Sequence, residues 1–372
     1  MNNTNRRLDR TLALLQQQGL DGLVIYSNGS YDLLRPNYLR YFSDFKPLCS
    51  NNAAILSRSG DIALLVEPPW DAGRARTHSW IANVIGTSNF TEDLSGLLHK
   101  FQIRGSVGVA GLKEMTEAVY STIEKIVNIQ PANDLIEQTA REKTEGDIEN
   151  VRQAAKIADS GFEALLEYAR PGITEYELAA EISFAMRSAG ADDSFVLLSS
   201  GTHNRAIHTP SDRRLSRSDI VLAEITPAYR GQFIQICRTL VLGNLKDVLR
   251  DKYDMLVQAL KAGIAQVTPG VSASHMSKAV NNVISEAGYA EYCCPPYMRA
   301  RGHGLGLGST APGAIIDDNT TNVFEKHQVI VVHPNQYLPE TGYLACGETV
   351  LVTDSSPERL SQTETKLYVI EV

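Results

Sequence analysis

The sequence has few cysteines and no long apolar run. Its five cysteines are an odd number and form no Cys-x-x-Cys pair: Cys49, Cys237, Cys293, Cys294 and Cys346. This usage is typical of a reduced, cytoplasmic protein. No apolar run reaches about 18 residues, so we expect no transmembrane span.

An excess of basic residues is also missing. The 372 residues carry 35 Lys plus Arg against 43 Asp plus Glu, a formal net charge of −8. Nucleic acids and anionic membranes need a basic surface, so we expect neither as a main partner. The first 19 residues alternate polar and apolar positions as an amphipathic helix does, and they lack the apolar stretch of a signal peptide. Export is therefore not expected.

The composition is otherwise that of a globular protein with about two domains. Hydrophobic residues make up 43% and charged residues 21% of the chain. A helical pattern at 6–19 precedes strand patterns at 20–27 and 52–66, and a strand at 105–111 precedes a helical pattern at 113–127. This alternation predicts an α/β domain at the start of the chain.

A turn signal and a dense charged stretch end this first region. Pro131 and the Asn133-Asp134 pair precede the charged residues that follow. Such segments are typical of domain boundaries. We therefore assign residues 1–136 to an N-terminal domain and residues 137–372 to a C-terminal domain.

The second half of the chain contains an internal repeat. Each copy begins with a long helical pattern, at 146–169 and at 248–266, and continues through a Pro-Gly pair and a second helical pattern. Each copy ends at a glycine 19 residues after the proline, Gly190 or Gly288. Strand patterns follow both copies, at 194–200 and 219–229 after the first and at 328–338 and 349–354 after the second. The C-terminal domain is thus predicted to be two helix-helix-sheet halves related by a pseudo-two-fold axis, and ligand sites tend to lie where such halves meet.

The second helix of each copy has a predicted start. Thr174 and Ser272 follow the Pro-Gly pairs as N-caps, and Glu177 completes a capping box on Thr174. The closing glycines are predicted C-caps.

Polar residues take matching places in the two halves: His208, Glu224, Gln235, His303, His333 and Glu348. A polar side chain inside an apolar strand must find a partner or face a cavity. Any one of them is equally well explained as a structural hydrogen-bonding group, but their joint placement favours a site. The glycines on both sides of His303 leave its imidazole unshielded and let the backbone approach a ligand; a glycine-rich turn with an incidental histidine is the alternative.

These residues carry a family resemblance that covers nearly the whole chain. Residues 190–353 resemble the pita-bread domain of the creatinase, prolidase and Xaa-Pro aminopeptidase superfamily, in the segments 199–225, 231–239, 302–308, 329–337 and 347–354. The NYLRYFSDF segment resembles the smaller domain of creatinase and the aminopeptidases. The resemblance implies an α/β (α+β) protein, with a creatinase/prolidase-like domain at 1–136 and a pita-bread catalytic domain with its pseudo-two-fold repeat at 137–372.

The resemblance also implies a metal centre, most of whose ligands are changed here. In the metallopeptidase members two Asp, the His of Gly-His-Gly, a Glu before Pro and a late Glu hold two divalent ions. These positions match Glu224, Gln235, His303, His333 and Gly347. Only Glu224, and Glu348 next to Gly347, remain as carboxylates that could offset the charge of two such ions. A metal-free site is therefore favoured. A single Zn, Fe or Mn ion held by His303, His333 and Glu224 stays open as the alternative.

Creatinase resembles this chain most closely in kind, because it is a metal-free member of the fold. Its catalytic histidine matches His208, which can accept a proton from water and return it to a leaving nitrogen. Glu224 is expected to hold a cationic substrate group or to orient that histidine. His303 and His333 are expected to donate hydrogen bonds to the oxygen that becomes negative.

Two positions depart from creatinase as well. The glutamates that bind its guanidinium-type substrate match Cys237 and the region of Cys346, so creatine itself is not expected. Both cysteines lie in apolar strand patterns, and packing is favoured over a thiolate paired with His303 or His333. Further candidates for substrate binding are Arg40, Gln235, Tyr297, Arg301 and Glu348.

The sequence therefore predicts a cytoplasmic, metal-independent hydrolase without a cofactor. It would cleave an amide or amidine-like carbon–nitrogen bond other than a peptide bond, in a small polar molecule. The resemblance implies a homodimer, because the N-terminal domain of creatinase-like dimers reaches the active site of the partner subunit. Two alternatives stay open: a one-ion Xaa-Pro aminopeptidase-like hydrolase or lyase, and a non-catalytic pita-bread module that binds a peptide or protein.

Overall fold

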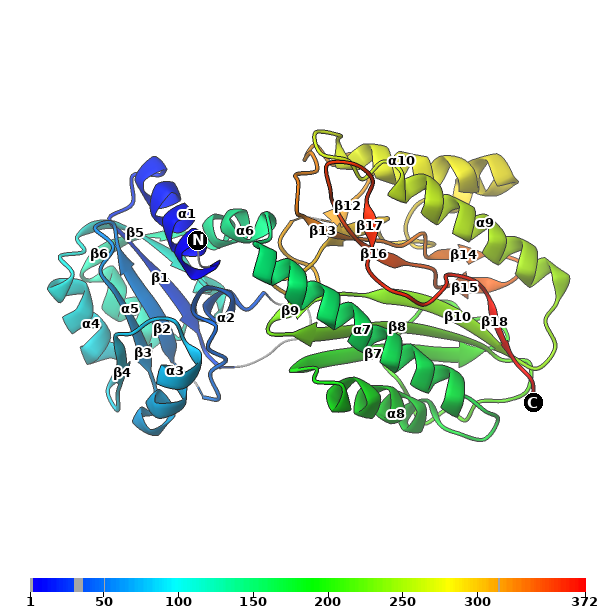
Figure 1. Cartoon of the computed structure of the whole chain (residues 1–372), viewed down its shortest axis with the longest axis horizontal. Coiled ribbons are helices and arrows are strands. Elements are labelled where there is room, and N and C mark those ends of the chain that lie inside the picture. Colours follow the sequence, from blue (N-terminus) through cyan, green and yellow to red (C-terminus); the bar gives the residue numbers. More distant parts are fainter. Residues whose placement is uncertain (1–2, 30–35, 50, 314) are drawn as a thin grey trace. The chain divides into compact units, whose positions relative to one another are not determined.

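The computed structural model describes residues 3–29, 36–49, 51–313 and 315–372 (Figure 1). Contacts divide the chain into two compact units, Met1–Thr144 and Glu145–Val372. The domain boundary expected after residue 136 falls inside helix α6 (Asn133–Arg141), which belongs to the first unit.

The first unit is built on a mixed six-stranded sheet in the order β4-β3-β2-β1-β5-β6. Its strands are β1 (Gly22–Ser27), β2 (Asn52–Ser57), β3 (Ile62–Val66), β4 (Val84–Gly86), β5 (Gly105–Ala110) and β6 (Val127–Pro131). Its helices are α1 (Asn3–Gln17), α2 (Tyr38–Ser43), α3 (Ala72–His78), α4 (Phe90–Lys100), α5 (Glu117–Glu124) and α6. The strands predicted from the sequence are present. The helical pattern at 113–127 gives only α5, because Val127 pairs with Gly105 and begins β6.

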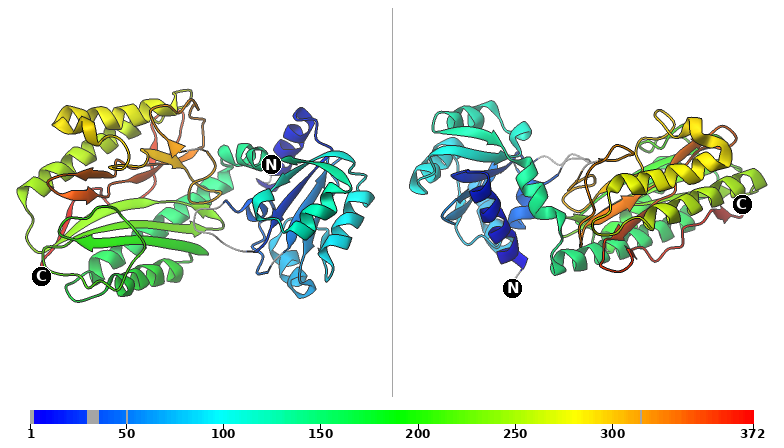
Figure 2. Two further views of the ribbon diagram at one scale, coloured as in Figure 1. Left: turned by 180° about the vertical axis from the view of Figure 1, so that it is seen from behind. Right: turned by 90° about the horizontal axis from the view of Figure 1, so that it is seen from above.

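The second unit contains two helix pairs and two five-stranded sheets (Figures 1 and 2). The helices are α7 (Glu145–Tyr168), α8 (Glu175–Ser188), α9 (Asp247–Ile264) and α10 (Ala273–Ile284). One sheet has the order β18-β10-β8-β7, with β9 beside β8, and the other has the order β12-β11-β13-β16-β17. This duplicated arrangement confirms the predicted fold class.

The first sheet of the second unit contains the longer strands, and the second sheet contains the shorter ones. The first sheet holds β7 (Asp193–Gly201), β8 (Ile220–Tyr229), β9 (Gln232–Phe233), β10 (Ile236–Leu242) and β18 (Tyr368–Ile370). The second holds β11 (Gly302–Gly304), β12 (Ile315–Ile316), β13 (Val329–Val332), β16 (Glu348–Leu351) and β17 (Glu358–Arg359), and β14 (Gln336–Leu338) pairs with β15 (Gly342–Leu344). The predicted strand at 328–338 is therefore broken at His333 and Pro334.

Two apolar cores hold the second unit together. In one, Phe162 of α7 and Leu178 of α8 pack with residues from both sheets. In the other, Leu256 of α9 and Met276 of α10 do the same. Each such side chain, when fully buried, contributes about 1.5–3 kcal/mol. In Figures 1 and 2, α9 and α10 run side by side. Within the described ranges, no helix has the length and apolarity that crossing a membrane requires.

The structure confirms one of the two predicted N-caps, that of α8. The Oγ1 of Thr174 accepts the Glu177 N–H at 3.1 Å and the Glu177 carboxylate accepts the Thr174 N–H at 2.7 Å, so the capping box is confirmed. Ser272 makes no such cap, because its hydroxyl contacts Ser274 Oγ and the Thr320 carbonyl instead. Gly190 has a φ of 102° just after the end of α8, as a C-cap glycine requires. Gly288 has a φ of 94° but lies beyond the end of α10, within the turn Ser285–Tyr289.

Candidate functional site

A short bridge between the two sheets brings the candidate residues together. Cys237 on β10 and Gly347 before β16 exchange both backbone hydrogen bonds, each 3.1 Å long. Cys237 is also the cross-strand neighbour of Glu224 on β8. The predicted location, where the two halves of the C-terminal unit meet, is therefore where several of these residues lie.

The thiol of Cys237 is the centre of a polar cluster. Its Sγ donates to Glu224 Oε2 at 3.8 Å and accepts from Gln235 Nε2 at 3.7 Å and Asn335 Nδ2 at 3.8 Å. Burial, with the nearby Glu224 charge, raises the pKa of this thiol well above its usual value. The thiol therefore stays protonated, which agrees with a packing and hydrogen-bonding role.

Glu224 is the carboxyl group of this cluster. Burial raises its pKa to about 7, and the charge of Arg299 and the hydrogen bonds from Cys237 and Gln235 act in the opposite direction. A carboxyl with this pKa exists in both protonation states near neutral pH, so it can take up and release a proton there.

His303 and His333 form a pair of buried imidazoles. Their ring centroids are 5.2 Å apart and their planes are inclined by 59°. Burial lowers the pKa of His303 to about 4; burial, together with the neighbouring His303, lowers that of His333 to about 3. The Nδ1 of His303 lies 3.0 Å from the Gly304 carbonyl, so this nitrogen carries the hydrogen and Nε2 is an acceptor. The Nδ1 of His333 is buried and has no hydrogen-bond partner in the described part of the chain.

The structure corrects two expectations about His303 and its neighbours. A neutral His303 whose Nδ1–H is used by Gly304 cannot donate to a negative oxygen. The glycines beside it also serve the packing: a Cβ on Gly302 would lie 2.3 Å from the Val331 carbonyl oxygen, and one on Gly304 1.7 Å from that of Pro312. Neighbouring backbone, and not a ligand, requires glycine at both positions.

Arg301 holds a loop in place and does not face a ligand. It is fully buried, and its guanidinium donates to Asn281 Oδ1 at 2.7 Å, to the Asn335 carbonyl at 3.2 Å and to Gln336 Oε1 at 2.8 Å. The expectation that it binds substrate is therefore not supported. Its contacts fix the segment that carries Asn335 to the cluster.

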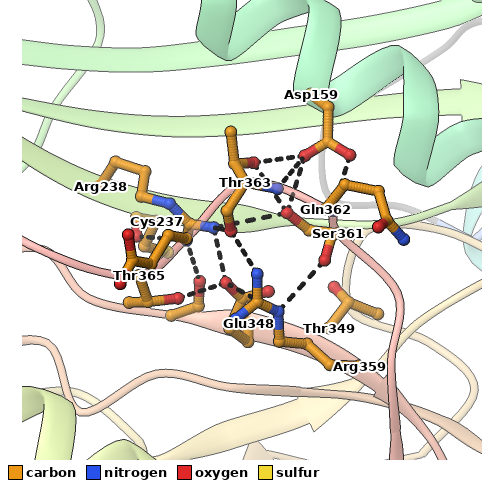
Figure 3. A network of polar contacts seen from close by, with 12 residues as sticks. Asp159, Cys237, Arg238, Glu348, Thr349, Arg359, Ser361, Gln362, Thr363 and Thr365 are labelled. Carbon is orange, nitrogen blue, oxygen red and sulfur yellow. Dashed lines mark hydrogen bonds and ion pairs between the residues drawn. The ribbon is translucent and has the colours of Figure 1, made fainter.

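Glu348 is likewise structural (Figure 3). It forms a 2.5 Å ion pair with Arg238, and the two side chains are 1% and 0% exposed. Arg238 also donates to the carbonyls of Cys237 at 3.0 Å and Gly347 at 2.7 Å. Arg238 thus joins Glu348 to both strands of the bridge. Arg238 and the Thr365 hydroxyl both engage Oε1 of Glu348, so internal contacts account for this carboxylate.

Two other predicted residues lie outside this cluster. His208 is exposed; its backbone N–H bonds Ser199 Oγ at 2.9 Å and its Nδ1 lies 2.7 Å from the Thr209 carbonyl. Among the interactions of the described residues, none joins its ring to Glu224 or to the histidine pair. Arg40 lies on α2 of the first unit.

Asn335 belongs to the polar cluster but was not among the predicted site residues. It follows Pro334, and a proline within an apparent strand was the only feature of the sequence that could have pointed to it.

The donors at the metal positions do not fit a two-ion centre. No group of three or more His, Cys, Asp or Glu side chains that could hold a metal ion occurs among residues 3–29, 36–49, 51–313 and 315–372. Glu224 therefore does not complete a three-donor site with the two histidines. At Gly347 a Cβ would lie 2.8 Å from the Cβ of His333 and 3.1 Å from the Sγ of Cys237, so the space that a glutamate needs is filled.

The raised pKa of Glu224 predicts a pH-dependent cost to stability. The folded protein binds this proton more tightly than the unfolded chain, so the stabilisation is complete below about pH 4.5 and is lost as the pH rises through about 7. The Glu224→Gln variant has no carboxyl group to ionise at this position, so it does not lose this stabilisation as the pH rises. We expect the variant to gain about 1–3 kcal/mol relative to the wild type between pH 5 and pH 8. Thermal unfolding of both proteins at several pH values measures this. His303 and His333, with pKa values of about 4 and 3, titrate below this pH range. Parallel stability curves of the two proteins would contradict the expectation.

Comparisons with known proteins agree with the fold. The profile "Metallopeptidase family M24" matches residues 149–354, and the profile "Creatinase/Prolidase N-terminal domain" matches residues 7–168. A Xaa-Pro dipeptidase from Pyrococcus furiosus is 26% identical over 366 residues, which cover 97% of this chain and 99% of that protein. The uncharacterized peptidase YqhT from Bacillus subtilis is 26% identical over 370 residues, which cover 98% and 100%.

Solved structures show the same likeness over the whole chain. The prolidase from Pyrococcus furiosus superposes with a TM-score of 0.80 at 25% identity, covering 95% of this chain and 99% of that one. The Xaa-Pro dipeptidase from Bacillus anthracis superposes with a TM-score of 0.85 at 23% identity, covering 99% and 100%. The resemblance stated from the sequence motifs is confirmed.

The same comparisons correct the predicted activity. A metallopeptidase profile and relatives named Xaa-Pro dipeptidase contradict a creatinase-like hydrolase of bonds other than peptide bonds. They also contradict the predictions of metal independence and of no cofactor. They favour the alternative of a Xaa-Pro peptidase, although the residues at the ligand positions do not provide the family's two-ion centre.

Proposed function

Because the chain belongs to metallopeptidase family M24, we propose that it acts on peptides and hydrolyses the bond between a residue and a following proline. The observation that carries this proposal is the match to a Xaa-Pro dipeptidase over nearly the full length of both proteins. The polar cluster lies where the two halves of the C-terminal unit meet, as expected of a ligand site. We further propose a cytoplasmic homodimer, which the cysteine usage and the resemblance to creatinase support.

The roles in this proposal are assigned to side chains alone, since the donor set does not fit the family's ions. Glu224 takes a proton from the attacking water and returns it to the proline nitrogen, which suits its pKa of about 7. The Nε2 of His303 accepts a hydrogen bond from a peptide N–H or amino group. Arg299, exposed and close enough to lower the pKa of Glu224, supplies positive charge beside the reacting carbonyl.

The test is the release of proline from the dipeptide Ala-Pro. Parallel reactions contain no added ion, Mn²⁺ or Zn²⁺, because the family is metal-dependent, and Ala-Ala serves as the control substrate. We expect free proline from Ala-Pro and little cleavage of Ala-Ala. Cleavage of neither dipeptide under any of the three conditions would contradict hydrolysis.

A second candidate is a pita-bread protein that binds Xaa-Pro peptides without cleaving them. The observation that favours it is the replacement of three carboxylate positions by Gln235, His333 and Gly347, the last in filled space. Calorimetric titration with Ala-Pro separates the two functions, because binding without proline release is expected only of this second candidate.

A further inference from the structure

A cavity of about 450 Å³ lies beside the first two turns of α7. Its walls come from α7, from the turn before β13, and from the chain between the end of β16 and β17. In the described part of the chain, none of its lining residues belongs to the polar cluster around Cys237 or to the histidine pair. We call it the α7 cavity. Small-molecule sites are concave regions of about 300–1,000 Å³, so its size is that of a binding site.

The most buried residues that line the α7 cavity are apolar. Ile148 on α7 is 7% exposed and Leu351 on β16 is 3% exposed, and both belong to the same apolar core. Because the core holds these two side chains in place, the cavity has a fixed aliphatic side. A ligand that fills it gains most when it places a hydrocarbon group there.

The rim of the α7 cavity is charged. Arg152 pairs with Glu358, and Lys326 pairs with Asp354 across the rim. Glu145, the first residue of α7, is exposed and forms no ion pair with another described residue. The rim therefore offers one carboxylate that has no cation of its own, and this carboxylate favours a positively charged group on the ligand.

Arg152 still has donors for a negatively charged group. Its Nε and Nη2 donate to Glu358 at 2.9 and 2.7 Å, and its Nη1 donates to no acceptor among the described residues. A guanidinium carries five N–H donors, so a second carboxylate can bind to Nη1 while the pair with Glu358 stays intact.

The spacing of these groups along α7 fits a short zwitterion. Glu145, Ile148 and Arg152 occupy positions i, i+3 and i+7, which lie on one face of a helix. Seven residues of helix rise about 10.5 Å. The ammonium and carboxylate of an α-amino acid lie about 3 Å apart, and a contact of about 3 Å at each end makes a total span of about 9 Å. Glu145 and Asp147 in the first turn of α7 offset the positive end of the helix dipole, so an ammonium group is not repelled there.

We infer that the α7 cavity binds a free α-amino acid with an apolar side chain. The ammonium group pairs with Glu145, the carboxylate accepts hydrogen bonds from Nη1 of Arg152, and the side chain packs on Ile148 and Leu351. A zwitterion brings no net charge to a rim whose other ion pairs stay closed. The inference goes beyond the proposed function and does not rest on it, because none of these residues takes part in hydrolysis.

Saturation-transfer NMR on the full chain tests the inference with three ligands. L-leucine carries both charges, leucinamide lacks the carboxylate, and N-acetyl-leucine lacks the ammonium group. We expect saturable binding of L-leucine, at least about tenfold tighter than that of either analogue, because each analogue loses one charge-assisted contact.

Variants of the rim locate the bound ligand. Arg152→Ala and Glu145→Gln should each weaken L-leucine binding by at least about tenfold, and both residues are exposed, so the variants should fold. Two matched controls should keep the wild-type affinity. Arg250→Ala removes an exposed arginine that pairs with Asp247 on α9, and Glu149→Gln removes another exposed carboxylate of α7.

Three results would overturn the inference. The first is a folded wild type that shows no saturable binding of L-leucine. The second is equal affinity for the three ligands, because the rim charges would then play no part. The third is wild-type affinity for L-leucine in both Arg152→Ala and Glu145→Gln, because the ligand would then lie elsewhere on the protein.

Discussion

Replacing Glu224 with glutamine is expected to lower the rate of proline release from Ala-Pro by about 100-fold or more. The amide has nearly the same size and shape as the carboxyl group, but it cannot accept and release a proton at neutral pH. Loss of a general acid–base group costs about 10²–10⁴-fold. The KM should change much less, because the variant preserves the shape of the site. Initial rates over a range of Ala-Pro concentrations measure both constants.

The pH profile distinguishes a proton-carrying role from a packing role. In the wild type the rate should rise with pH up to about 7, where Glu224 becomes ionised, and then level off. Glu224→Asp keeps a carboxyl and should retain part of the rate, whereas Glu149→Gln on the exposed surface of α7 should have no effect. A Glu224→Gln enzyme with the wild-type rate and profile would exclude this role.

Arg238→Ala is expected to destabilise the protein by about 3–5 kcal/mol. The substitution removes the nearer cation of the buried Glu348 carboxylate and leaves Arg359, whose Nε lies 3.9 Å away; a buried charge that loses its partner costs about this much. It also removes the hydrogen bonds to the carbonyls of Cys237 and Gly347 that support the bridge. For a unit of this size, the melting temperature should fall by about 6–20 °C. Thermal unfolding followed by circular dichroism measures the change.

The chain offers a matched control for this prediction. Arg152 also forms a pair with a glutamate, Glu358, at 2.9 and 2.7 Å, but the arginine is 52% exposed. Exposed pairs contribute about 0–1 kcal/mol. Arg152→Ala should therefore change the melting temperature by no more than a few degrees. Equal effects of the two substitutions would show that the buried pair has no special role.

Local patterns predicted the helices of the repeat well. The pattern at 146–169 corresponds to α7 (Glu145–Tyr168), because one side of a long helix must be apolar along its whole length. The strands were predicted less well. The strand expected at 328–338 stops at His333 because Pro334, lacking an N–H group, cannot continue a ladder. Gln235 was placed within a strand but lies between β9 and β10.

The sequence was enough to predict where in the chain the site residues lie, but not which side chains and strands contact one another there. The bridge joins Cys237 to Gly347, far apart in the chain, and no local pattern shows such a contact. Glu348 was a candidate because a charge within an apolar strand requires a partner. Arg301 was a candidate because a cation near the Gly-His-Gly segment can contact a substrate carboxylate. The structure shows that each partner is internal.

The predicted activity failed for a different reason. Counting carboxylates at the ligand positions tests whether two ions are compensated, but it does not test which bond is cleaved. Loss of ligands therefore does not imply a change of substrate, and two relatives that match nearly the whole chain are named Xaa-Pro dipeptidase and prolidase.

Calorimetric titration of Ala-Pro into the wild type and into His303→Ala tests the central claim most directly. The claim is that the polar cluster around Cys237 and the pair of His303 and His333 together bind a Xaa-Pro peptide. We expect binding to the wild type, loss of at least about tenfold in affinity in His303→Ala, and unchanged affinity in His275→Ala on the exposed side of α10. No binding to the folded wild type, or equal affinities in all three proteins, would contradict the claim.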